Sequence, residues 1–169
     1  MPKDNLERMI KLADEFFGMR TDPSQLSVTP EVMTKLKEIH PATLSEETNG
    51  NGPVAWMLII PTTEDVMEQF LREEISEREL LEKTRPGETF EAIYLCSALV
   101  LPEYRGKGIA RRLVRQAIVS IMEQHPVQHL FVWLFSAEGE RLAGLVAGEF
   151  RLPLHKRTSG KKNAAARGT

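Results

Sequence analysis

The sequence has few of the residues that define several common classes of protein. It contains a single cysteine, Cys96, so no internal disulfide forms, and we expect this thiol to be a small core side chain. Its longest apolar runs fall far short of the roughly 20 residues that a membrane-spanning helix needs. Neither sign of charge dominates, because 22 basic and 24 acidic residues leave a net charge of −2. A membrane surface or nucleic acid is therefore not indicated as the main partner.

The remaining composition is typical of one globular domain. Of the 169 residues, 41 % are hydrophobic and 27 % are charged. The first residues are polar and do not resemble a secretory signal, so we expect a cytoplasmic protein. Residues 1–154 are interpreted as the domain and residues 155–169 as a basic, mobile tail without acidic residues. The alternative, nucleic-acid contact through this tail, predicts that deleting residues 155–169 abolishes function.

The central feature of the chain is a predicted strand, turn and helix within residues 91–122. Residues 92–101 are apolar and β-favouring, as in a buried strand, and Pro102 removes a backbone donor at its end. After the turn, a helix is predicted to begin near Gly106 or Gly108. Its apolar side chains recur at helical spacing, namely Ile109, Ala110, Leu113, Val114, Ala117, Ile118, Ile121 and Met122.

The turn between this strand and helix has the composition of a pyrophosphate site. Its two glycines let the backbone approach a ligand closely, and the first amides of a helix carry partial positive charge. Cationic side chains surround the turn, at Arg105, Lys107, Arg111 and Arg112. A P-loop is excluded because no Ser or Thr follows Gly108, and a dinucleotide fingerprint because Arg111 replaces its third small residue. The alternative is an ordinary corner with a solvated basic end.

The residues Val100-Leu-Pro102-Glu-Tyr-Arg105-Gly-Lys-Gly108-Ile-Ala110 closely resemble the acetyl-CoA-binding motif of the GNAT superfamily of N-acetyltransferases, at every position of the motif. The resemblance implies an α/β fold with a mixed, mostly antiparallel central sheet. In that fold, a parallel pair of strands splays around the cofactor and helices flank the sheet. It also implies acetyl-CoA as co-substrate and no metal.

The resemblance also assigns cofactor-binding residues. The backbone amides of the turn would hold the CoA pyrophosphate, and the end of the strand would pair with the pantetheine arm. Ser136 stands where the family has an asparagine. The implied set is Leu99, Val100, Leu101, Arg105, Gly106, Lys107, Gly108, Ile109, Ala110, Arg111 and Ser136.

The catalytic residues are less well specified by the sequence. The tyrosine that often serves the family as general acid is missing from its usual place, since the only tyrosines are Tyr94 and Tyr104. Glu91, near the start of the central strand, and Tyr94, on the same strand, are the candidates for catalysis. The alternative for Glu91 is a solvated strand end. His129 is interpreted as a core histidine rather than a base.

The other elements follow from periodicity and turn residues. Helices are predicted over residues 4–17, 30–40 and 138–147, a hairpin over 43–60, and strands over 127–135 and 150–154. A first strand is expected only as a short piece near 26–28. Residues 62–84 are interpreted as an inserted helical arm, in which acidic residues outnumber basic ones. This acidity either attracts a cationic amine to the acceptor site or belongs to a solvated face.

These observations predict an acetyl-CoA-dependent N-acetyltransferase that acts on a primary amine of a small molecule or peptide, with a cationic acceptor favoured by the arm. The resemblance also suggests a homodimer. The alternative is a degenerate domain of the same fold that binds an acyl-CoA as a sensor or interaction module, because the usual tyrosine and asparagine are absent.

Overall fold

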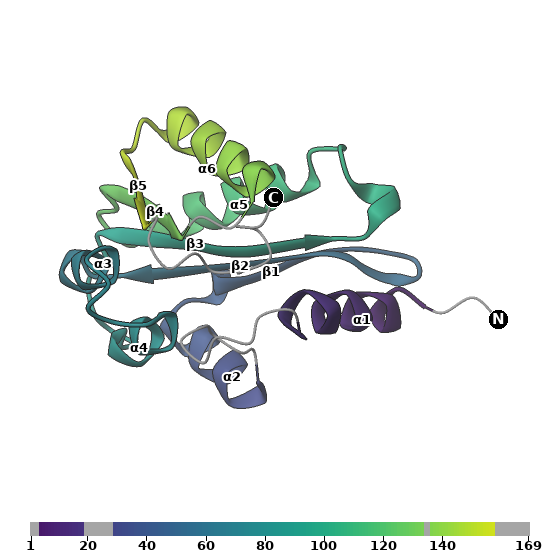
Figure 1. Ribbon diagram of the computed structural model, residues 1–169, viewed down its shortest axis with the longest axis horizontal. Coiled ribbons are helices and arrows are strands. Elements are labelled where there is room, and N and C mark those ends of the chain that lie inside the picture. Colours follow the sequence, from purple (N-terminus) through teal and green to yellow (C-terminus); the bar gives the residue numbers. More distant parts are fainter. Residues whose placement is uncertain (1–3, 19–28, 134–135, 158–169) are drawn as a thin grey trace.

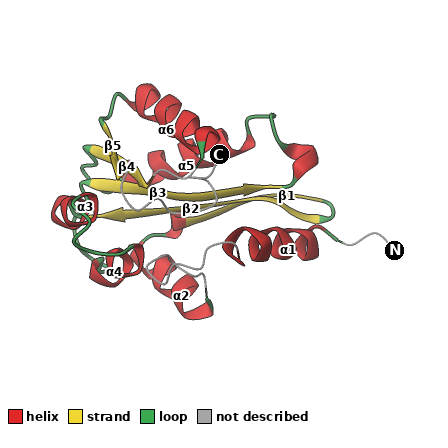
Figure 2. Cartoon of the chain, viewed as in Figure 1, coloured by secondary structure: helices red, strands yellow, loops and turns green. Residues whose placement is uncertain are grey.

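The computed structural model describes residues 4–18, 29–133 and 136–157, which form one sheet with helices on both of its faces (Figures 1 and 2). The sheet has five strands in the order of the sequence. They are β1 (Leu44–Asn49), β2 (Gly52–Thr62), β3 (Ala92–Val100), β4 (His129–Trp133) and β5 (Leu154–Arg157). The predicted mixed α/β fold is confirmed.

The pairing of the strands changes from antiparallel to parallel in the middle of the sheet. β1–β2 and β2–β3 are antiparallel, whereas β3–β4 and β4–β5 are parallel. The antiparallel ladders are the longer ones. The β3–β4 ladder runs only from Ala92–His129 to Tyr94–Phe131, although β3 continues to Val100. The two strands therefore diverge after Tyr94, as the expected splayed pair requires.

β3 carries a β-bulge just beyond this point of divergence. Leu95 pairs with Ile59 and Ser97 pairs with Leu58, so that Cys96 is an extra residue in the ladder with β2. A bulge of this kind increases the local twist and turns the following side chains toward the other face of the sheet. The end of β3 is thereby directed away from the path of β4.

The helices lie on two sides of the sheet. α5 (Ile109–Met122) and α6 (Ala137–Phe150) lie above it in the view of Figure 1, and α1 (Asn5–Gly18), α2 (Pro30–Ile39) and α4 (Glu77–Lys83) lie below. α3 (Glu64–Leu71) lies at one end of the sheet. Short 3₁₀ turns, η1 (Pro41–Thr43) and η2 (Pro102–Tyr104), precede β1 and α5. No helix in these ranges has both the length and the apolar character that a bilayer crossing requires.

The predicted apolar stripes pack against the sheet in two clusters. The stripe of α5 packs with Ile59, Ile93 and Leu130 in one cluster. In the other, the helices of the predicted arm pack with Tyr94 and Phe131. Burial of these faces explains why the segments form helices, since apolar burial contributes about 25 cal/mol per Å².

Some sequence predictions differ from the structure at their boundaries. The last strand runs over Leu154–Arg157 rather than over residues 150–154, so the first residues assigned to the tail belong to β5. The remainder of the tail, residues 158–169, and the expected piece of strand near residues 26–28 lie outside the described residues. The predicted strand over 127–135 is shorter, at His129–Trp133, with residues 134–135 also outside the described ranges.

Candidate active-site cleft

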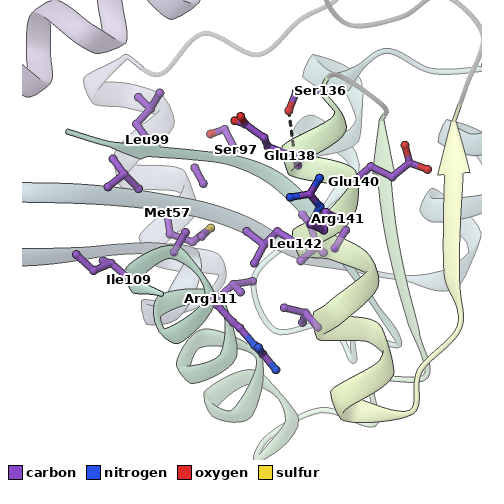
Figure 3. A pocket seen from close by; sticks show the side chains of 18 of the residues that line it. Met57, Ser97, Leu99, Ile109, Arg111, Ser136, Glu138, Glu140, Arg141 and Leu142 are labelled. Atoms are coloured by element: carbon purple, nitrogen blue, oxygen red, sulfur yellow. Dashed lines mark hydrogen bonds between the residues drawn. The ribbon is translucent and has the colours of Figure 1, made fainter. Parts of the chain in front are cut away.

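A cleft of about 690 Å³ opens where β3 and β4 diverge (Figure 3). Its walls are the second half of β3, the turn before α5, the first turns of α5, the end of β4 and one face of α6. This volume is within the range of small-molecule and cofactor pockets. The cleft lies beyond the last β3–β4 pair, so the edge of β3 that faces it is free of β4.

The turn at one end of the cleft presents backbone rather than side chains. Gly106 and Gly108 have φ angles of +76° and +77°, a region that disfavours residues with a Cβ. A Cβ built at either glycine meets no atom within 4 Å in the described chain. Gly108 is the N-cap of α5, and no described side chain caps this helix. The first amides of α5 are therefore available to a ligand.

Cationic side chains surround this turn, but several are already held by acids. Arg111 and Arg115 both donate to the Glu149 carboxylate on α6, Arg111 at 3.0 Å, and Arg112 lies 2.9 Å from a Glu47 oxygen. The hydrogen bond from Arg111 and the charge of both arginines lower the pKa of Glu149. Arg105 donates its Nε to the Val100 carbonyl at 3.0 Å, which fixes the turn against the end of β3. Ion pairs and a backbone hydrogen bond therefore hold these arginine side chains in place around the turn.

The α6 side of the cleft carries both polar and apolar side chains. Ser136 caps the helix by accepting from the Gly139 amide at 3.0 Å (Figure 3). One turn further on, Leu142 points into the cleft, and Leu145 lines it while remaining 48 % exposed. Met57 on β2 forms part of the floor. An exposed leucine on the wall of a cleft favours a ligand with an apolar arm.

The structure brings most of the predicted cofactor residues together. The cleft is lined by Leu99, Val100, Arg105, Gly106, Gly108, Ile109, Ala110, Arg111 and Ser136. Two others of the predicted set are outside this lining. Leu101 is 1 % exposed and donates its amide to the Val54 carbonyl, and Lys107 extends over the Tyr104 ring at 5.6 Å.

The two predicted catalytic residues lie away from the cleft. Glu91 precedes β3 at the end opposite the cleft, where its carboxylate accepts from the Glu64 amide at 2.9 Å. Tyr94 is fully buried in the cluster that includes the arm, stacked on Phe131. Neither residue contributes to the described lining, so neither is carried into the proposal below.

His129, which the sequence analysis interpreted as a core histidine, is partly buried and lies outside the described lining of the cleft. Its Nδ1 lies 3.1 Å from the Nε2 of His155 on β5, and its own Nε2 lies 3.5 Å from a Glu64 oxygen. Burial, and then the neighbouring charge of His129, lower the pKa of His155. This pair connects β4, β5 and the arm.

Several polar residues of the cleft were not identified from the sequence. Ser97 and Glu138 lie near the predicted Ser136 at one end of it (Figure 3). Tyr104 also belongs to the lining. The hydroxyl of Tyr104 accepts a hydrogen bond from the Asn49 side chain at 2.6 Å. No motif marks Ser97 or Glu138, because the bulge in β3 and the start of α6 decide which side chains face the cleft.

Comparison with known proteins agrees with this geometry. Residues 82–145 match the model of the Acetyltransferase (GNAT) family. The predicted resemblance is confirmed. It supports the prediction of an acyltransferase, and the family generally uses acetyl-CoA. The match extends from the end of the arm through β3, α5 and β4 into α6, which are the elements that form the cleft.

Among solved structures, one match is an aminoglycoside acetyltransferase, meta-AAC0020, from an uncultured soil metagenomic sample, in complex with trehalose. The two chains are 13 % identical with a TM-score of 0.46, over 83 % of this chain and 76 % of that one. Among curated proteins, none matches the sequence significantly.

The inserted arm does not contribute to the cleft. Its helices α3 and α4 pack on β3, β4 and β5 through the aromatic cluster, and none of its residues is part of the described lining. Most of its acidic side chains are exposed or half-buried. The arrangement thus favours a solvated acidic face over an acidic wall at this cleft.

Proposed function

We propose that this protein is an acetyl-CoA-dependent N-acetyltransferase that acts on a primary amine of a small molecule or peptide. The observation that carries the proposal is the cleft itself. It joins a glycine turn at the start of a helix that no described side chain caps, the part of β3 beyond its last pair with β4, and the side of α6 that carries Leu142 and Leu145, all within the segment that matches the family.

The residues present fit the parts of an acyl-CoA. The amides at Gly106–Ile109 and the side chain of Arg111 would bind the pyrophosphate, because helix N-termini and arginines both favour phosphate oxygens. The free edge of β3 at Leu99 would pair with the amides of the pantetheine arm. Leu142 and Leu145 would pack against its methylene groups.

The co-substrate supplies the reactive thioester, and the acceptor supplies a neutral amine. In the reaction, the attacking nitrogen would form a bond to the acetyl carbon as the carbon–sulfur bond breaks, and the proton that the nitrogen loses would pass, through solvent, to the departing CoA sulfur. We propose that the chain itself mainly positions these atoms where the strands diverge. The hydroxyls of Ser97 and Ser136 lie at that end of the cleft and can donate hydrogen bonds to the departing group (Figure 3).

Ligand binding at the glycine turn can be tested by thermal unfolding. Acetyl-CoA at millimolar concentration is expected to raise the melting temperature, because a ligand that binds only the folded state stabilises it. Gly108→Trp should remove this shift by filling the space above the turn. Gly87→Trp is the matched control, since Gly87 also has a positive φ and open space but lies outside the described lining. No shift with the unmodified protein would refute the cofactor assignment.

The alternative function is a sensor that binds acyl-CoA without transfer. It is favoured by one observation, that the two tyrosines of the sequence are Tyr94, buried behind the sheet, and Tyr104, bonded to Asn49. Release of free CoA thiol, measured with polyamines, aminoglycosides, amino acids and peptides, separates the two functions. Turnover with one amine class would establish the enzyme and its acceptor, and binding without any turnover would favour the sensor.

A further inference from the structure

The inserted arm, residues 62–84, is attached at several points to the face of the sheet opposite the cleft. At its base, the hydroxyls of Thr62 and Thr84 lie 2.7 Å apart, and both residues are fully buried. At its far side, the Arg157 guanidinium lies 4.5 Å and 4.4 Å from the ring centres of Phe70 and Trp133. Arg157 also donates to the Ile75 carbonyl at 2.9 Å. The arm is therefore an integral layer of the fold.

One acidic side chain of the arm differs from the rest. Glu77, the first residue of α4, is 0 % exposed, whereas the other acidic side chains of the arm are exposed or half-buried. Its Oε2 accepts the Tyr94 hydroxyl at 2.5 Å and the Cys96 thiol at 3.7 Å. A buried carboxylate is costly unless donors satisfy it, and a hydroxyl donating to a carboxylate makes a strong bond. The contacts with Tyr94 and Cys96 therefore fix the position of the Glu77 carboxylate.

The two donors lie on either side of the place where the cleft begins. Tyr94 is in the last pair that joins β3 to β4, and Cys96 is the bulged residue of β3. Cys96 also belongs to the lining of the cleft. A single carboxylate oxygen therefore ties the last paired residue of β3 to the first part of the cleft wall.

We propose that Glu77 is a positioning residue that holds the bulge in β3 from behind and so sets the shape of the cleft wall for the acyl end of the ligand. This inference rests on the proposed function, because it assumes that the cleft binds an acyl-CoA. Glu77 does not touch the ligand. It acts through Tyr94 and Cys96, and it makes the inserted arm part of the acyl-transfer machinery.

The test replaces the carboxylate with the amide of the same shape. Glu77→Gln removes the charge and weakens acceptance from both donors. We expect its dissociation constant for acetyl-CoA, measured by calorimetry below the melting temperature of each variant, to rise about tenfold. Glu82→Gln is the matched control, because Glu82 is an exposed acid on the same helix, and its affinity should equal that of the unmodified protein.

A second readout does not depend on the cofactor. Cys96 is the only cysteine of the sequence, so its alkylation by a maleimide reports on the cleft wall alone. In Glu77→Gln the contact between the thiol and the Glu77 carboxylate is weakened and the bulge is held less firmly, so alkylation should accelerate at least about tenfold. Tyr94→Phe keeps the carboxylate and removes one donor, and it should accelerate alkylation to a smaller extent. If Glu77→Gln does not fold, this second variant carries the test.

The outcomes separate this inference from the proposed function. Failure of the unmodified protein to bind acetyl-CoA would refute the proposed function, whatever the alkylation rates. Equal alkylation rates in the unmodified protein, Glu77→Gln and Tyr94→Phe would overturn the positioning role. Loss of thermal stability in Glu77→Gln with unchanged acetyl-CoA affinity would also overturn it, because Glu77 would then serve stability alone.

Discussion

The two faces of the sheet differ in how completely the helices cover the strands. On the face of α5 and α6, the strands diverge and leave a cleft with exposed glycines, arginines and Leu145. On the face of the arm, aromatic side chains close the sheet, with the rings of Phe70 and Tyr94 5.0 Å apart. The first face therefore contains an open cleft, and the second is closed by packed aromatic rings. Stability and binding should therefore respond to different substitutions.

The largest effect on stability is expected from the closed face. Phe70 is fully buried and contacts Tyr94, Phe131, Trp133 and Arg157. Phe70→Ala should lower the free energy of unfolding by about 3–5 kcal/mol, the usual cost of a large cavity in a core. Leu145→Ala on the cleft should cost much less stability and instead weaken acetyl-CoA binding. Equal stability losses in urea unfolding would contradict the division between the faces.

A smaller loss of stability is expected from substitution of Arg157, whose guanidinium packs against Phe70 of the arm. Arg157 lies between two aromatic rings and its Nε is buried without a hydrogen-bond partner in the described chain. Lysine keeps the charge but not the flat surface, so Arg157→Lys should cost about 1–3 kcal/mol. Lys156→Arg is the control, since Lys156 forms an exposed ion pair with Glu140. If urea unfolding shows no difference between the two variants, the stacking of Arg157 contributes nothing.

Acid should weaken the packing around two histidines before the cleft is affected. Burial, and then the charge of His40, lower the pKa of His125, and burial lowers that of His155. Folding therefore favours the neutral rings. The stability they contribute is complete above the ordinary histidine pKa of about 6.5 and is lost as the pH falls through their folded pKa values.

The urea midpoint should accordingly fall between about pH 7.5 and about pH 5.5. His125→Asn combined with His155→Asn should flatten this profile, because asparagine does not titrate. An unchanged slope in that double variant would show that other groups cause the acid sensitivity.

The smallest effect is expected at the mouth of the cleft. Glu149 holds Arg111 and Arg115, and its carboxylate competes with a phosphate for these cations. Glu149→Gln should leave the melting temperature almost unchanged, since exposed ion pairs contribute little. It should tighten acetyl-CoA binding up to about threefold at low salt and less at high salt. Weaker binding in this variant would mean that Glu149 orients the arginines instead of competing for them.

Local signals in the sequence were enough to predict which segment borders the cleft. The strand end, the glycine turn and the stripe of α5 are contiguous, and most of residues 99–111 belong to the lining, although Leu101 and Lys107 do not. The inserted arm was also predicted, because its turns and helical spacing are local. The helix over residues 138–147 was also predicted, and α6 extends beyond it at both ends, over Ala137–Phe150.

The remaining features depend on contacts between distant residues. The bulge at Cys96 is a property of the ladder with β2 and leaves no mark in the sequence of β3. In the sequence, nothing distinguishes Glu77 from the other acidic residues of the arm. Its contact with Tyr94 arises only in the folded chain. Glu91 and Tyr94 were candidates because the family often has a carboxylate near the start of this strand, and that position does not show which part of the fold a side chain contacts. In the structure, Glu91 precedes β3 at the end away from the cleft, and the Tyr94 side chain is buried against the arm.

The most direct test of the account is hydrogen–deuterium exchange with and without acetyl-CoA. It reports on both faces of the sheet at once, because amide protection follows local contact and burial. If the cleft binds acetyl-CoA, amide exchange should slow at residues 97–101 and 106–111, slow less at the start of α6 and stay unchanged in α2. Protection centred on α2, or no protection anywhere at saturating acetyl-CoA, would contradict the assignment of the cleft as the acyl-CoA site.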